Sequence, residues 1–254
     1  MTGAGGSEGG AGGDAAARAA LLVEELRALG SEESRAGMAR YGIEVRDAFG
    51  VSVYELRRVA KRVGSDHELA LALWATGNHE ARLLAAFVDD PARVTGEQLE
   101  SWVLDLDSWD VCDQLTTDLV DRTPFAHAKA AEWAQRPEEW VRRAGFALMA
   151  GLAVHDRQAP DEAFLAFFPL IAAGAWDDRN FVKKAVNWAL RNIGKRDGAL
   201  NEAAVALAEG IRAAADRAAG GPRGGGPGAR SARWVAADAL RELRSPKVQR
   251  RLGR

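Results

Sequence analysis

The sequence predicts an all-α fold, an α-solenoid built from HEAT-like antiparallel helix pairs. Ala, Leu, Glu and Arg dominate the composition, and β-branched residues are sparse. Apolar residues recur at helical spacing, with only short links between the periodic segments. Stacked helix pairs bury many such short amphipathic helices, and their curvature leaves a long concave face that can hold an extended partner.

The periodicity is nearly continuous between a Gly-rich start and a stretch rich in Gly and Pro near the end. Helices are expected over 14–29, 31–40, 52–63, 65–76, 78–89, 95–104, 109–120, 124–135, 137–153, 161–174, 178–194, 198–218, 230–243 and 245–251.

Several of these helices carry recognisable start signals. Thr95 and Gln98 have the spacing of a capping box. Pro124 and Pro137 suit first helical turns, where a missing N–H costs nothing. Acidic residues that suit helix starts are Asp161, Asp177 and Asp178.

Composition divides the chain into four segments. Residues 1–13 read as a disordered Gly-rich tail, because Gly at this density cannot offset its ordering entropy. Residues 14–219 form the solenoid domain, and 220–229 form a linker rich in Gly and Pro. Residues 230–254 form a basic helical arm; from position 222 onward there are nine Arg or Lys against two Asp or Glu.

The bulk numbers exclude several classes of protein. The formal net charge is −2, so any surface for nucleic acid must be a local patch. The single cysteine, Cys112, excludes a disulfide framework or a cysteine-based zinc site, and the four histidines are scattered. No apolar run is long enough to span a bilayer. We expect a cytoplasmic monomer without a membrane partner, metal or cofactor.

The stretch "SWDVCDQLTTD" (108–118) has an unexpected polar face. A helix from Trp109 places Trp109, Asp113 and Thr117 along one side, at successive i, i+4 positions. The apolar residues Val111, Leu115 and Leu119 lie on the other side. A purely structural interpretation has Asp110 capping the helix, Asp113 in solvent and Trp109 covering a neighbouring helix end. Cys112 is expected to be a small packing residue.

The stretch "DDRNFVKKAVNWALRNIGKRD" (177–197) combines an aromatic residue with cations. Trp188 lies opposite an apolar side formed by Val182, Val186, Ala189 and Ile193. Its neighbours on the polar side are Lys184, Arg191 and Lys195. A tryptophan can stack on a base or sugar while flanking cations contact phosphates. The alternative is a packed tryptophan and a solvated basic face.

The stretch "EEWVRRAGFALMAGLAVHD" (138–156) is apolar nearly all round, which indicates a deeply packed helix. Arg142 and Arg143 interrupt it. A buried or half-buried arginine needs a carboxylate or phosphate partner. Structural ion pairing and phosphate binding are therefore both open for this pair.

Together these stretches resemble the DNA alkylation repair family of HEAT-like glycosylases, the AlkD-like type, over about residues 35 to 200. "SWDVCD" is similar to the family's Trp–Asp-x-x-Asp motif, "WVRRA" to its Trp-x-x-Arg helix, and "FVKKAVNWALR" to its Lys-Ala-x-x-Trp-x-Leu-Arg helix. "HEARLLA" (79–85) and "YGIEVRDAFGVSVYELR" (41–57) look like the family's early repeats.

The resemblance implies roles for individual residues. Asp113 matches the catalytic carboxylate, and Trp109 and Trp188 match the tryptophans that line the lesion site. Arg143 matches an arginine that contacts the DNA backbone, with Arg142 as its alternative in the alignment. His79 is expected to be structural. The basic face of Lys184, Arg191 and Lys195 is the further DNA-binding candidate.

The function expected from this resemblance is that of an alkylpurine DNA glycosylase. Its partner would be double-stranded DNA containing positively charged N3- or N7-alkylated purines, excised by hydrolysis of the N-glycosidic bond without base flipping. A cytoplasmic, nucleoid-associated location would follow. Two alternatives stay open: a noncatalytic binder of DNA structures on the same scaffold, and a HEAT-type protein-interaction scaffold. The residues Trp109, Asp113, Arg143 and Trp188 are expected to line one concave, electropositive groove.

Overall fold

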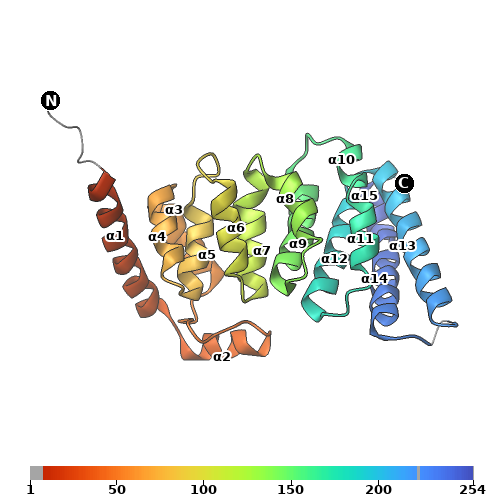
Figure 1. Cartoon of the computed structure of the whole chain (residues 1–254), viewed down its shortest axis with the longest axis horizontal. Coiled ribbons are helices and arrows are strands. Elements are labelled where there is room, and N and C mark those ends of the chain that lie inside the picture. The colour runs from red at the N-terminus through yellow and green to blue at the C-terminus, as the bar shows by residue number, and fades with distance from the viewer. Residues whose placement is uncertain (1–7, 222–223, 254) are drawn as a thin grey trace. The chain divides into compact units, whose positions relative to one another are not determined.

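A computed structural model describes residues 8–221 and 224–253, with side chains from residue 12 onward (Figure 1). These residues form fifteen α-helices and one 3-10 helix, and the described ranges contain no β-strand. The all-α prediction is confirmed. The chain divides into two compact units, Met1–Thr123 and Pro124–Arg254.

The first unit contains seven α-helices and the 3-10 helix η1. They are α1 (Glu8–Leu29), α2 (Glu32–Arg40), α3 (Val53–Val63), α4 (His67–Ala75), α5 (His79–Val88), α6 (Gly96–Leu104), α7 (Trp109–Asp118) and η1 (Val120–Arg122). Helix α5 packs against α3, α4 and α7.

The second unit contains eight α-helices. They are α8 (Ala126–Trp133), α9 (Glu139–His155), α10 (Asp161–Leu165), α11 (Phe168–Gly174), α12 (Asn180–Ile193), α13 (Gly198–Ala218), α14 (Pro227–Leu243) and α15 (Pro246–Arg251). Helix α12 packs against α9 and α14, and α14 also packs against α13. In both units, helices joined by short turns pack side by side, as in HEAT-like repeats.

The structure changes three expected boundaries. Helix α1 extends back to Glu8, so residues 8–13 are helical rather than a disordered tail, because the Ala-rich segment that follows supplies a helix onto which further turns can add; residues 1–7 lie outside the described residues. The expected helix 161–174 is interrupted between α10 and α11. Helix α14 begins at Pro227, inside the expected linker, and residues 222–223 of that linker are not described.

The start signals have mixed outcomes. The Thr95 side chain accepts the Gln98 N–H at 3.1 Å, as the capping box requires, but the Gln98 side chain donates to Asp89 at 2.7 Å rather than to the cap. Asp161 is the first residue of α10, as expected. Asp177 does not cap α12, which begins at Asn180 with Arg179 as its N-cap residue.

A buried carboxylate on α5 holds the segment that leads into α3. Glu80 is fully buried. Its oxygens accept the backbone N–H groups of Phe49 at 2.9 Å, Gly50 at 2.7 Å and Val51 at 3.2 Å. Gly50 has φ +83°, and a Cβ there would lie 2.2 Å from the Ser31 carbonyl oxygen. Only glycine therefore fits this turn.

A second charged side chain of α5 holds the loop that precedes α7. Arg82 is buried and donates to both carboxylate oxygens of Asp107, at 2.8 and 3.0 Å. It also donates to the Asp105 carbonyl oxygen at 2.8 Å. The Asp105 carboxylate in turn accepts the indole N–H of Trp74 at 2.9 Å. The start of α7 is thus fixed from within the first unit.

In the second unit, close backbone approach and buried amides fix the long helices. A Cβ on Gly145 of α9 would lie 2.2 Å from the Ala134 nitrogen, so glycine lets α9 meet the end of α8. Asn187 of α12 is buried and donates to the Val235 carbonyl oxygen of α14 at 3.0 Å. These contacts fix which side of α12 faces inward.

We predict that Glu80→Ala lowers the free energy of unfolding by about 3 kcal/mol, because two buried N–H groups and the partly buried N–H of Phe49 lose their acceptor, at roughly 1–3 kcal/mol for each buried group. Urea denaturation followed by tryptophan fluorescence measures this change, since the stacked Trp74 and Trp102 rings, 4.1 Å apart, report on the first unit. Glu33→Ala, at an exposed position of α2, should stay within about 0.5 kcal/mol of the parent. Equal stability of the two variants would contradict the role given to Glu80.

Candidate functional site

Helix α7 presents the polar face that the sequence predicts. Trp109, Asp113 and Thr117 are half-buried along one side. The residues Val111, Leu115 and Leu119 are fully buried on the other, as is Cys112. The hydroxyl of Thr117 donates to the Asp113 carbonyl oxygen at 2.7 Å, so it is satisfied within the helix. A large aromatic side chain and a carboxylate therefore lie one helical turn apart on the same face.

Asp110 does not have the role expected for it. The N-cap residue of α7 is Ser108, and Asp110 is a buried residue of the first turn. One carboxylate oxygen of Asp110 accepts the Ser108 hydroxyl at 2.5 Å, and the other lies 2.9 Å from Nε2 of His79. Burial raises the pKa of Asp110, but the hydrogen bonds from His79 and Ser108 outweigh it and lower that pKa below its usual value. His79 is itself buried, which gives it the structural position expected for it.

Helix α7 makes two further contacts that sequence reasoning missed, one at Trp109 and one at Asp118. The indole N–H of Trp109 donates to the Tyr41 carbonyl oxygen at 3.1 Å, and the Tyr41 side chain is 75% exposed. Arg57 of α3 makes a two-pronged ion pair with Asp118 of α7, both contacts at 2.9 Å. No local pattern could have paired residues so distant in the sequence.

Helix α12 carries the second aromatic candidate. The residues Val182, Val186, Ala189 and Ile193 are fully buried, as expected. Trp188 is half-buried on the other side, and Lys184 is exposed, with no ion pair among the described residues. The predicted basic face therefore exists, although its cations differ in how they are engaged.

Two of the three predicted cations on this face are already paired. Arg191 and Lys195 both form ion pairs with Glu242 of α14, with the Lys195 contact at 2.7 Å. Burial raises the pKa of Glu242, but the hydrogen bonds from Lys195 and Arg191 outweigh it and lower that pKa below its usual value. Glu242 thus offsets one of the two positive charges.

The two arginines of α9 have partners inside the second unit. Arg142 donates to the Ala134 carbonyl oxygen at 3.0 Å and forms an ion pair with Asp177 at 3.2 Å. Structural ion pairing is therefore confirmed for Arg142. Arg143 is only 5% exposed and donates to the Phe181 carbonyl oxygen at 2.7 Å. The burial of Arg143 weighs against a simple surface contact with phosphate, and a DNA contact by either arginine stays a prediction.

The predicted common groove involves both units. Trp109 and Asp113 belong to the first unit, whereas Arg143 and Trp188 belong to the second. Each unit by itself presents the expected helix face. Their joining into one groove stays a prediction.

Residues 8–221 and 224–253 contain no group of three or more His, Cys, Asp or Glu side chains that could hold a metal ion. None of the helices described is both long and apolar enough to cross a membrane.

The model of the DNA alkylation repair enzyme family matches residues 22–243. The chain belongs to this family. One solved structure aligns with a TM-score of 0.67 at 22% identity, covering 74% of this chain and 81% of the other. It comes from work on a new family of proteins related to the HEAT-like repeat DNA glycosylases with affinity for branched DNA structures. The similarity shows that this member of the DNA alkylation repair family has the HEAT-like helical fold. A comparison with curated proteins finds no match.

We predict that Asp110→Asn costs about 1.5–3 kcal/mol of stability, because the buried Nε2 of His79 and the Ser108 hydroxyl both lose a charged hydrogen-bond acceptor. The lowered pKa of Asp110 means that its carboxylate stabilises the fold above the usual titration range and that this stability is lost as the pH falls below about 4. Urea midpoints measured from pH 7 to pH 3 should therefore fall in the parent and converge on those of Asp110→Asn.

The control for this series is Asp14→Asn, at an exposed position of α1. Its midpoints should follow those of the parent at every pH. A constant gap between the parent and Asp110→Asn down to pH 3 would contradict the role given to the ionised carboxylate of Asp110.

For DNA binding, we predict opposite effects from two changes on the basic face. The logarithm of the DNA association constant falls linearly with the logarithm of the salt concentration. Lys184→Ala should make this slope shallower by about 0.9, the contribution of one neutralised phosphate. Glu242→Gln should steepen that slope and tighten binding to undamaged duplex, because Lys195 loses its acidic partner and Arg191 keeps only its 3.8 Å contact with Asp238. Fluorescence anisotropy over a salt series measures both effects.

Lys247→Ala, at an exposed position of α15, removes the same charge as Lys184→Ala and should leave the slope unchanged. If Lys184→Ala and Glu242→Gln both bind as the parent does, the basic face is only solvated.

Proposed function

We propose that this member of the DNA alkylation repair family is a glycosylase that excises positively charged N3- or N7-alkylated purines from duplex DNA. The observation that carries the proposal is the half-buried Asp113, which lies one helical turn after Trp109 on the polar face of α7. Family membership over residues 22–243 supports DNA repair as its setting. We also propose a cytoplasmic, nucleoid-associated monomer.

The proposed reaction needs a carboxylate more than it needs a strong acid. An N-alkylated purine already carries a positive charge, so it leaves with the electrons of the N-glycosidic bond as a neutral base. The sugar that remains has oxocarbenium character. The carboxylate of Asp113 would stabilise that cation and position the water that adds to the anomeric carbon, with release of one proton.

The two tryptophans would help to stabilise the same positive charges, on the base and on the sugar. The face of an indole ring attracts a cation, so Trp109 and Trp188 suit a cationic base and a developing sugar cation. Trp109 is fixed by its hydrogen bond to the Tyr41 carbonyl oxygen, which limits how its ring can rotate. Lys184, Arg191 and Lys195 would contact the phosphates of the same duplex, and we propose no base flipping.

A second candidate function is the noncatalytic binding of DNA structures. It is favoured by the solved relative, whose family has affinity for branched DNA structures. That function needs the basic surfaces but not the carboxylate of Asp113. The two candidates therefore differ in what happens when the charge of Asp113 is removed.

We predict that Asp113→Asn lowers the rate of base release by about 10²-fold or more, the usual effect of losing one electrostatic stabiliser of a transition state. Binding to undamaged duplex should hold or tighten, because a negative charge near phosphates is removed. Release of 7-methylguanine and 3-methyladenine from alkylated DNA at saturating enzyme, in a single turnover, separates chemistry from binding.

The matched control is Glu97→Gln, which removes one negative charge at an exposed position of α6 in the same unit. It should excise at the parent rate. Equal rates for Asp113→Asn and the parent would overturn the carboxylate mechanism. A parent that binds branched DNA but releases no base would favour the second candidate instead.

A further inference from the structure

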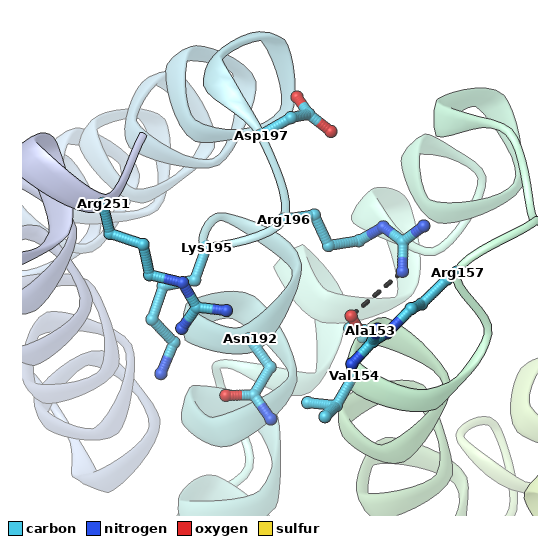
Figure 2. Close-up of a pocket in the computed structure, with 8 residues that line it drawn as sticks. All are labelled: Ala153, Val154, Arg157, Asn192, Lys195, Arg196, Asp197 and Arg251. Atoms are coloured by element: carbon cyan, nitrogen blue, oxygen red, sulfur yellow. Dashed lines mark hydrogen bonds between the residues drawn. The ribbon is translucent and has the colours of Figure 1, made fainter. Parts of the chain in front are cut away.

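A basic pocket lies where α9 and α12 end, beside α15 (Figure 2). We call it the C-terminal basic pocket, and its volume is about 400 Å³. All of its residues belong to the second unit. The polar side chains that line it are Arg157, Asn192, Lys195, Arg196, Asp197 and Arg251.

Arg196 is held in place and makes the pocket more favourable for an anion. Arg196 donates to the carbonyl oxygens of Ala153 at 3.0 Å and Asp156 at 2.8 Å, and its guanidinium lies 4.0 Å from the centre of the Phe164 ring. The carbonyl groups at the end of α9 would otherwise present negative partial charge to the pocket. Arg196 neutralises them.

The single acid of the pocket is also engaged. Asp197 is the N-cap residue of α13, and its side chain accepts the Leu200 N–H at 2.8 Å. Lys195 forms an ion pair with Glu242 of α14, which offsets its charge. The positive charge left for a ligand therefore comes mainly from Arg157 and Arg251.

Arg157 and Arg251 are the cations available to a ligand. Both are exposed, and neither side chain has a hydrogen bond or ion pair within the described ranges. Figure 2 shows Arg251 reaching into the pocket between Lys195 and Asn192, and Arg157 entering from the other side. A guanidinium pair of this kind suits the oxygens of a phosphate group, which it can bind through two N–H donors at once.

The pocket continues the helix face that carries Trp188. Asn192 lies one turn after Trp188 in α12, on the same side of the helix, and Lys195 follows it. Lys195 lies seven positions after Trp188, in the turn that follows the end of α12 at Ile193, so the two residues are on the order of 10 Å apart along the helix direction. That length matches the axial rise of about three base pairs of duplex DNA.

We propose that the C-terminal basic pocket holds a backbone phosphate of bound DNA, about three nucleotides from the base that faces Trp188. This inference rests on the DNA binding within the proposed function and adds a contact outside its reactive centre. It also gives the basic C-terminal segment a defined role, because Arg251 supplies one side of the pocket.

The test compares two double variants that remove the same charge. Arg157→Ala with Arg251→Ala should weaken binding to undamaged duplex about tenfold, the effect of losing a charged hydrogen bond. It should also reduce the salt slope by about 0.9, for one phosphate. Arg212→Ala with Arg250→Ala removes two exposed arginines of α13 and α15 outside the pocket and should change affinity less than about twofold.

A scan with neutral methylphosphonate linkages locates the phosphate. At one position, about three nucleotides from the lesion, the substitution should weaken the parent but not the Arg157/Arg251 double variant. The same result is expected in duplexes with and without 5′-phosphates. An effect confined to 5′-phosphorylated duplexes would overturn the assignment to the backbone.

Base release at saturating enzyme separates this inference from the proposed function. The Arg157/Arg251 double variant should excise at the parent rate once bound. If the parent excises no base but the double variant still loses affinity and salt slope, the pocket is supported and the glycosylase proposal fails. If the two double variants bind alike while the parent excises normally, the pocket assignment is wrong.

Discussion

The first unit depends on the contacts that three buried polar side chains of helix α5 make with neighbouring segments. Glu80 satisfies three backbone N–H groups before α3. Arg82 holds the loop before α7, and His79 holds Asp110 in the first turn of that helix. Each of these side chains would be costly to bury alone. Since each binds a different segment, α5 sets where its neighbours begin.

The candidate site inherits its rigidity from these contacts. Trp109 and Asp113 stand on a helix whose first turn is held by a buried pair and whose preceding loop is held by Arg82. A reactive carboxylate must stay within a fraction of an ångström of its productive position. The buried contacts at the start of α7 therefore help to hold Asp113 in place. In the second unit, Glu242 does something different: it holds Arg191 and Lys195 in place but also reduces the charge they offer to DNA.

The sequence predicted the helix faces well because a helix face depends only on local periodicity. The sides of α7 and α12 follow from the spacing of apolar residues, and both are confirmed. It predicted individual partners poorly. Asp110 looked like a cap because acidic residues favour first turns, yet its partner His79 lies on another helix. Arg191 looked free because Glu242 is far away in sequence.

The sequence by itself determined the helical class, most helix positions and the resemblance that places the chain in its family. These features depend on the local sequence pattern, which does not change with the residues that pack against it in the folded chain. Only the tertiary structure decided which charges are available. It paired Arg142 with Asp177 and left Arg157 and Arg251 open at one pocket. The reason is physical: the state of a charged side chain is set by what packs against it, and packing joins residues that the sequence keeps apart.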